Sequence, residues 1–219
     1  MNIIIDLHTH TIFSDGVLIP SELVQRAIAH GYRAIAITDH ADISNLDFII
    51  PRIIKVSEQL NKRGVIKVIP GIELTHAPPE LIKSLVKEAR NLGARLIIVH
   101  GQTITEPVIQ GTNRAAIMAG IDILAHPGLI DNEDVLMAKE KGVALEISYR
   151  KGHSLTNGHV AKLALYYGAS LVINTDTHSP EDMINKDTAI NILRAAGIDK
   201  EKIPDILKNS DIIVERVLS

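Results

Sequence analysis

The feature that most constrains this chain is a regular alternation between short β-branched runs and longer segments with helical periodicity. Buried parallel strands consist of continuous valine, isoleucine and leucine, and each needs a crossover connection before the next strand. The alternation therefore predicts a parallel sheet covered by helices. We expect its strands at Asn2–Leu7, Ala34–Thr38, Val65–Leu74, Arg95–Val99, Ile121–Ala125, Ala144–Ile147 and Ser170–Asn174.

The segments between these runs have the start and stop signals of helices. Pro20 lies where the first turn of a helix would begin, and Gly31 lies just after its end. A glycine follows most of the later segments in the same way. We expect helices at Pro20–His30, Leu46–Arg63, Pro79–Leu92, Thr112–Ala119, Glu133–Lys141, Thr156–Tyr167 and Lys186–Ala196, with a helical tail from Ile203.

Seven such strands in 219 residues predict one α/β domain that spans residues 1–219. The periodicity alone fits either a closed barrel or an open sheet. A barrel gathers the carboxyl ends of its strands at one mouth, whereas an open sheet spreads them along an edge. The polar residues at these ends therefore distinguish the two architectures.

Metal-competent side chains follow six of the seven predicted strands. His8 and His10 follow the first strand, Asp176 and His178 follow the last, and residues at i and i+2 project from the same face of a strand. A barrel would gather all of these groups around one cavity, with Asp15 folding back from the first loop. This convergence favours a closed barrel. The full set is His8, His10, Asp15, His40, Glu73, His100, His126, Asp176 and His178.

Six of the ten histidines belong to this set. So many polar groups packed together would carry a desolvation cost of several kcal/mol unless cations or hydrogen bonds satisfied them. The chain has no cysteine, so its ligands are imidazole nitrogens and carboxylate oxygens, which suit Zn, Mn and Fe. One ion takes roughly four to six such ligands, so the set implies two or three divalent ions, with Glu73 as the candidate bridge.

Together these motifs resemble those of the polymerase and histidinol phosphatase family, the PHP domains. The resemblance runs through Asp6-Leu7-His8-Thr9-His10, Thr38-Asp39-His40, Gly71-Ile72-Glu73, His100, Ala125-His126-Pro127 and Thr175-Asp176-Thr177-His178. It implies a distorted seven-stranded (β/α)7 TIM-like barrel with a trinuclear metal centre, and it places the whole set above at the metal positions. Some members have histidine where this chain has Asp15, a change that keeps a ligand. Because every position is filled, the resemblance favours an enzyme.

A multinuclear site of this kind, like the resemblance, predicts hydrolysis of a phosphoester. We expect a hydroxide that bridges two ions to attack phosphorus, without a protein nucleophile. Arg150, after the sixth strand, is the candidate catalytic residue that grips the phosphate. Asp39 is the second candidate; it neighbours ligand His40, and we expect it to have a supporting or structural role rather than to be a ligand, because neighbouring strand residues point to opposite faces. Further candidates for substrate binding are Lys151, His153 and His76.

A long loop, Gln102–Asn113, follows the fourth strand, and loops at this face of a barrel often determine specificity. Thr105, Asn113 and Arg114 are minor candidates for substrate contact there. His30 and His159 lie in predicted helices, and we expect both on the surface outside the site.

The bulk properties argue against several classes of partner. The net charge is −3 and no long basic run is present, which argues against nucleic acid. The apolar runs are far shorter than the roughly 20 residues that a membrane span needs. No leader-like segment precedes the first strand, so we expect a cytoplasmic protein.

Three functional hypotheses follow. The leading one is a phosphatase for a small-molecule phosphate monoester, with histidinol phosphate as one candidate substrate. A nuclease or phosphodiesterase acting on nucleic-acid ends would use the same chemistry but needs a wider groove and basic flanks. The third is a catalytically inactive metal-binding scaffold, against which the intact ligand set argues.

Overall fold

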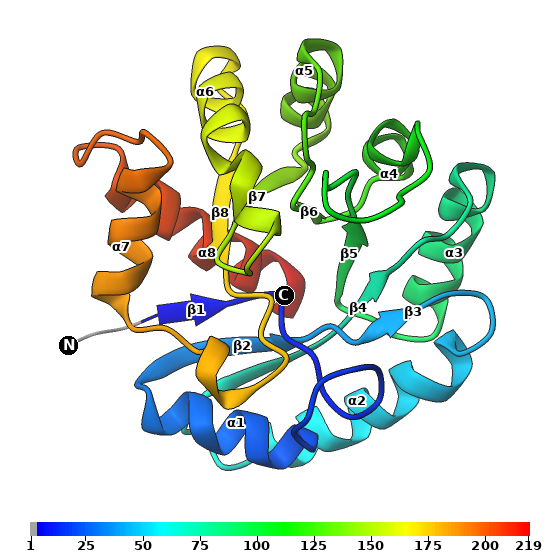
Figure 1. Ribbon diagram of the computed structural model, residues 1–219. Coiled ribbons are helices and arrows are strands. Elements are labelled where there is room, and N and C mark those ends of the chain that lie inside the picture. The colour runs from blue at the N-terminus through cyan, green and yellow to red at the C-terminus, as the bar shows by residue number, and fades with distance from the viewer. Residues whose placement is uncertain (1–3) are drawn as a thin grey trace.

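The computed structural model describes residues 4–219, and its parallel strands form a nearly closed barrel surrounded by helices (Figure 1). The strands are β1 (Ile4–Asp6), β2 (Tyr32–Ile37), β3 (His40–Ala41), β4 (Lys67–Leu74), β5 (Leu96–His100), β6 (Ile123–Ala125), β7 (Ala144–Ser148) and β8 (Leu171–Asn174). They pair in the order β1-β2-β4-β5-β6-β7-β8. The predicted seven-stranded α/β barrel is therefore confirmed. Asn2 and Ile3 of the first predicted strand lie outside the described residues.

The short strand β3 continues β2 after a break. Both strands pair with β4 in one register, with Ile37 opposite Pro70 and His40 opposite Glu73. Thr38 and Asp39, which lie between β2 and β3, are not part of either paired segment. This arrangement brings His40 directly beside Glu73, so the break in the strand lies at the edge of the polar cluster.

The helices lie within a few residues of their predicted bounds, as expected for elements with clear terminal signals. They are α1 (Pro20–Ala29), α2 (Leu46–Asn61), α3 (Pro79–Asn91), α4 (Thr112–Ala119), α5 (Asn132–Lys141), α6 (Asn157–Tyr167), α7 (Lys186–Ala195) and α8 (Ile203–Leu218). The Asp131 carboxylate accepts the Asp134 N–H at the start of α5, and Gly142 ends that helix with a φ of 70°. Within residues 4–219, each helix is too short or too polar to cross a bilayer.

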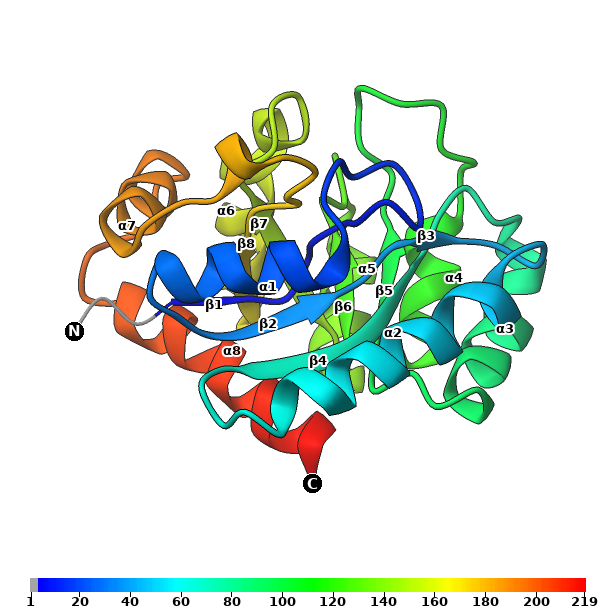
Figure 2. The same ribbon diagram turned by 90° about the horizontal axis from the view of Figure 1, so that it is seen from below.

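Two apolar cores stabilise the barrel. The outer core lies between the strands and the surrounding helices and contains residues such as Ile35 and Ile97. The inner core fills the barrel with alternate strand residues such as Leu96 and Ile98, and α8 contributes Val214 to it. Helix α8 crosses the base of the barrel (Figure 2). This end is therefore sealed by aliphatic side chains, and the polar groups gather at the opposite, carboxyl end.

The barrel closes between its first and last strands at that carboxyl end. The His10 N–H donates to the Thr177 carbonyl oxygen at 2.8 Å, and Thr9 and Thr177 form an isolated parallel bridge. The Leu7 N–H donates to the Asn174 side-chain oxygen at 3.0 Å. Over residues 4–219, no regular ladder joins β1 to β8. Closure therefore depends on the segments that carry the first and last predicted ligands.

Candidate metal centre

The predicted ligands converge in one cluster, and the Glu73 carboxylate lies at its centre. Its Oε2 is 3.3 Å from His8 Nε2 and 2.6 Å from His40 Nδ1. Its Oε1 is 3.4 Å from His100 Nδ1 and 3.7 Å from His126 Nε2. One buried carboxylate thus faces histidines from four strand ends, the arrangement that a bridging ligand requires.

Asp176 is the second buried carboxylate of the cluster. Its Oδ1 lies 3.1 Å from His10 Nε2 and 3.6 Å from His8 Nε2. Asp176 follows β8, whereas both histidines follow β1. The closure of the barrel therefore brings these three side chains together.

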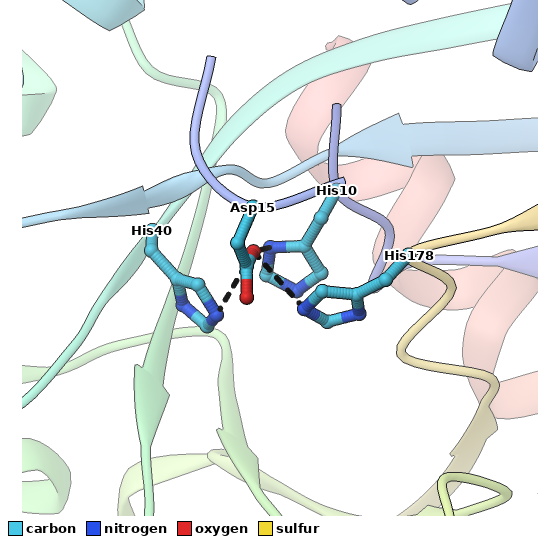
Figure 3. Close-up of side chains that lie close together, drawn as sticks. All are labelled: His10, Asp15, His40 and His178. Carbon is cyan, nitrogen blue, oxygen red and sulfur yellow. Dashed lines mark ion pairs between the residues drawn. The ribbon is translucent and has the colours of Figure 1, made fainter. Parts of the chain in front are cut away.

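A third, more exposed group lies around Asp15 (Figure 3). The Asp15 Oδ1 is 3.1 Å from His178 Nε2, 3.5 Å from His40 Nε2 and 4.0 Å from His10 Nδ1. The Asp15 side chain is 55% exposed, and its loop turns back at Gly16. A Cβ at Gly16 would lie 2.6 Å from the His10 carbonyl group, so glycine permits this close approach.

Many of these donor atoms are buried without a hydrogen-bond partner in the described part of the chain. Each such atom costs about 1–3 kcal/mol if nothing satisfies it. Within the cluster, the unpartnered atoms are His8 Nε2, both ring nitrogens of His10, His100 and His126, Glu73 Oε1 and Asp176 Oδ1. Imidazole lone pairs and carboxylate oxygens that face one another in this way fit divalent cations, which would satisfy both.

Burial and mutual charge shift the titration of these groups. Burial raises the pKa of Asp176 to about 7. Burial, with His40 and His8 nearby, lowers the pKa of His10 well below its ordinary value. Burial acts on His8 in the same direction, but surrounding carboxylates, Glu146 first, raise the pKa of His8 well above its ordinary value. His10 is therefore neutral at pH 7, which is the form that binds a metal ion.

Backbone strain is concentrated at the same place. Among the described residues, the non-glycine residues with positive φ are His76 at 52°, His126 at 26° and Asp176 at 57°. Such conformations cost about 1–3 kcal/mol each and occur mainly at functional sites. Two of the three are predicted ligands, and the third was a candidate for substrate binding.

Glu146 on β7 is a site residue that the sequence analysis missed. His8 Nδ1–H donates to Glu146 Oε2 at 2.8 Å, and Asn174 Nδ2 donates to the same oxygen at 2.9 Å. This contact fixes the His8 tautomer and leaves His8 Nε2 free for an ion. The signal was a glutamate within the apolar run Ala144–Ile147, because a carboxylate rarely lies in a buried strand without a partner.

The Asp39 carboxylate binds the loop that follows β1. Its carboxylate accepts hydrogen bonds from the Thr11 N–H at 2.7 Å, the Thr11 hydroxyl at 2.8 Å and the Ser14 hydroxyl at 2.8 Å. His40 Nδ1 lies instead 2.6 Å from the Thr75 hydroxyl. The hydrogen bonds of Asp39 therefore hold the loop that carries Asp15, which is the structural role among those expected.

Three of the four candidates for substrate binding line a cavity of about 240 Å³ above the cluster. Arg150, His153 and His76 line it. Arg150 Nε lies 3.6 Å from Asp176 Oδ2, which holds the guanidinium at the cavity wall. Lys151 is exposed and does not line this cavity.

The loop between β5 and α4 contributes Glu106, which sequence reasoning also missed. Glu106 lines the cavity, and its carboxylate faces histidines from three other segments. Thr105 lies next to it, with its hydroxyl 3.4 Å from His153 Nδ1. Asn113 lies in the first turn of α4, where its side chain accepts from the Gln102 N–H and donates to the Pro127 carbonyl oxygen. Arg114 pairs with carboxylates of α5. Glu106 becomes recognisable as a site residue only where separate loops come together in the fold. The sequence around Glu106 carries no local signal of these contacts.

The two histidines expected outside the site do lie there. His30 is exposed at the end of α1. His159 on α6 is half-buried, and its Nε2 donates to the Ile130 carbonyl oxygen at 2.7 Å.

The sequence model of the PHP domain matches residues 6–163 of this chain. The chain belongs to the PHP family. It is 48% identical over 204 residues to an uncharacterised protein of Methanocaldococcus jannaschii, a match that covers 92% of this chain and 94% of that protein. It is 29% identical over 228 residues to a probable phosphatase of Shewanella sp. strain MR-4, covering 91% of this chain and 86% of the relative.

Solved structures share the fold of this chain at low sequence identity. A chain of an archaeal ribonuclease P with mature tRNA has a TM-score of 0.75 at 19% identity, covering 96% of this chain and 90% of that one. A histidinol phosphate phosphatase of Lactococcus lactis, solved with zinc, L-histidinol and phosphate, has a TM-score of 0.61 at 18% identity, covering 89% and 94%. These likenesses concern the fold alone. Asp176 and His178 of this PHP protein lie beyond the matched residues, and the closure of the barrel brings them into the cluster.

Proposed function

We propose that this PHP protein is a metal-dependent phosphoesterase that hydrolyses a small-molecule phosphate monoester. The observation that carries the proposal is a buried set of nitrogen and oxygen donors below a cavity whose wall holds the Arg150 guanidinium. Metal ions and a planar guanidinium together suit a phosphate group, because both neutralise its charge and arginine donates two parallel hydrogen bonds. The probable phosphatase among its relatives supports the same class of reaction.

The donor groups support three ions, with Zn, Mn or Fe as the candidates. We assign one ion to His8, His10, Glu73 and Asp176, a second to Glu73, His100 and His126, and a third to Asp15, His40 and His178. Such ions, when bound, lower the pKa of a coordinated water and polarise the phosphate. With the ligand set intact, an inactive scaffold is the less favoured reading.

The remaining polar residues would bind and orient the substrate. Arg150 is 31% exposed, so its guanidinium can face a phosphate in the cavity while Asp176 holds its position. Burial lowers the pKa of His153 to about 4, so this imidazole is neutral at pH 7 and adds no charge to the wall. Arg150 therefore supplies the fixed positive charge of this wall.

The size and charge of the cavity support a small ester. A volume of about 240 Å³ holds a phosphate and a compact alcohol, and the net charge of −3 provides no general attraction for a polyanion. Histidinol phosphate is one candidate of suitable size, supported by the L-histidinol bound in the Lactococcus lactis phosphatase.

A nuclease acting on nucleic-acid ends is the second candidate. The fold likeness to a chain of ribonuclease P is the observation in its favour. The chain has no long basic run to bind the backbone of a longer strand, which favours the small ester.

The test is a side-by-side assay of the purified protein. Bound metals are measured first, and then p-nitrophenyl phosphate, histidinol phosphate and a labelled oligonucleotide are supplied with and without chelator. We expect monoester turnover that the chelator abolishes and divalent metal restores. Oligonucleotide cleavage without monoester turnover would favour the nuclease, and a metal-bound protein that hydrolyses neither would favour the scaffold.

A further inference from the structure

We propose that His76, His100, Glu106 and His153 form an additional divalent-cation site at the entrance of the cavity, which we call the rim site. Three of these residues lie outside the predicted ligand set, and His100 is shared with it. They come from four segments: the loops after β4 and β5, the end of β5, and the short helix after β7. The proposal concerns metal binding and stands independently of the phosphoesterase reaction.

The separations between donor atoms carry the proposal. Glu106 Oε2 lies 3.0 Å from His100 Nε2 and 3.4 Å from His76 Nε2, and Glu106 Oε1 lies 3.4 Å from His153 Nε2. A tetrahedral ion with bonds of 2.0–2.1 Å holds its ligand atoms about 3.3 Å apart. Two pairs of predicted ligands in the main centre have a similar spacing, 3.1 Å between His10 and Asp176 and 3.3 Å between His8 and Glu73.

The hydrogen bonding of the individual ring nitrogens of His100 and His153 also supports a metal site. His100 is 3% exposed, and its Nε2, which faces Glu106, has no hydrogen-bond partner in the described chain. His153 Nδ1 lies 2.8 Å from the Thr103 hydroxyl, which leaves its Nε2 turned toward Glu106. A metal-binding histidine commonly has its second ring nitrogen anchored in this way.

His76 adds an independent observation. It has a φ of 52°, and the two other described non-glycine residues with positive φ, His126 and Asp176, are predicted ligands. Such a conformation persists only where the surroundings impose it, and it turns the His76 ring over the entrance beside His100, with 5.0 Å between ring centroids. One donor atom from each of His76, His100 and Glu106 lies within 4.8 Å of the others.

The chemistry of the donors suggests the ion. Three imidazoles and one carboxylate suit Zn²⁺ and the neighbouring transition metals rather than Mg²⁺ or Ca²⁺. The side chains of His76 and Glu106 are 42% and 38% exposed. His100 also faces Glu73 through Nδ1, so it would bind ions in both sites only after losing its ring proton to water. We therefore expect weaker and more rapidly exchanging binding than in the main centre.

The experiment is a Zn²⁺ binding titration of the whole protein with metal counting by mass spectrometry. Wild type is compared with Glu106→Gln and His76→Gln, which change two different loops. The matched controls are Glu133→Gln and His30→Gln, exposed residues of the same types outside the cavity. Titration with Co²⁺ gives a second readout, because its visible absorption reports ligand number and type at each step.

We expect wild type and both controls to take up one weak equivalent after the tight ones. In Glu106→Gln and His76→Gln this equivalent should bind at least tenfold more weakly, with the tight equivalents unchanged. Equal weak binding in all five proteins would overturn the rim site. Loss of a tight equivalent in either variant would also overturn it, because the residue would then support the main centre instead.

Discussion

The floor and the rim of the cavity are built from different parts of the barrel. The floor is His8, Glu73, Glu146 and Asp176, which lie on strands or directly after them and are almost fully buried. The rim of the cavity, which is not the same set of residues as the rim site, consists of loop residues that are about a third to half exposed. They are Asp15, His76, Glu106 and Arg150. Charges in the floor cost much free energy unless ions or partners satisfy them, whereas water screens those in the rim. We therefore expect substitutions in the floor to reduce activity strongly and substitutions in the rim to change substrate binding.

The largest effect is expected from a ligand in the floor. His8→Ala removes a donor between Glu73 and Asp176 and should lower phosphatase turnover on the order of 10³-fold, equivalent to several kcal/mol of transition-state stabilisation. The measurement is kcat/KM for p-nitrophenyl phosphate at saturating metal. The control is His30→Ala, far from the floor. Wild-type turnover in His8→Ala would disprove the assignment of the floor.

A buried carboxyl beneath the floor should make stability depend on pH. Burial raises the pKa of Asp6 from 3.8 to about 6. Between pH 3.8 and pH 6 the Asp6 carboxyl is therefore ionised in the unfolded chain but still protonated in the folded protein. The contribution of Asp6 to the free energy of unfolding is greatest below about pH 4. It falls as the pH rises through 6, by about 3 kcal/mol in total. Asp6→Asn lacks this dependence. We expect the difference in unfolding free energy between the metal-free proteins, measured in urea, to change by this amount, and a constant difference would contradict it.

The support of His8 by Glu146 should matter less than His8 itself. Glu146→Gln keeps the shape and removes the charge that fixes the His8 tautomer, so metal affinity should fall about 10- to 100-fold. Competition with a chelator of known affinity measures this change. A variant that regains activity at high metal concentration would identify Glu146 as a positioning residue, whereas unchanged affinity would remove it from the site.

The rim should show a smaller and more selective effect. Arg150→Ala should lower kcat/KM for a phosphate monoester about tenfold, through a higher KM, because a partly exposed charged hydrogen bond is lost. Lys151→Ala is the matched control, since Lys151 neighbours Arg150 but does not line the cavity. An equal effect of both substitutions would mean that only the general positive charge of the loop matters.

The sequence by itself determined the order of strands and helices and the residues at the strand ends. Local periodicity and the terminal signals of helices are short-range properties, so they can be read without the fold. The donors from His8 to His178 were predicted in the same way, because the carboxyl ends of barrel strands meet at one mouth.

Only the tertiary structure decided which groups lie behind these donors. Glu146 meets His8 across 138 residues, and Glu106 meets His76 and His153 from separate loops, contacts for which no local pattern exists. The same holds for Asp39, whose hydrogen bonds go to the first loop rather than to its neighbour His40. Closure through Thr9 and Thr177 is equally non-local. Contacts between distant segments depend on the packing of the whole chain. The residues that hold the ligands in place, and the loop residues around the cavity, could therefore be identified only from the structure.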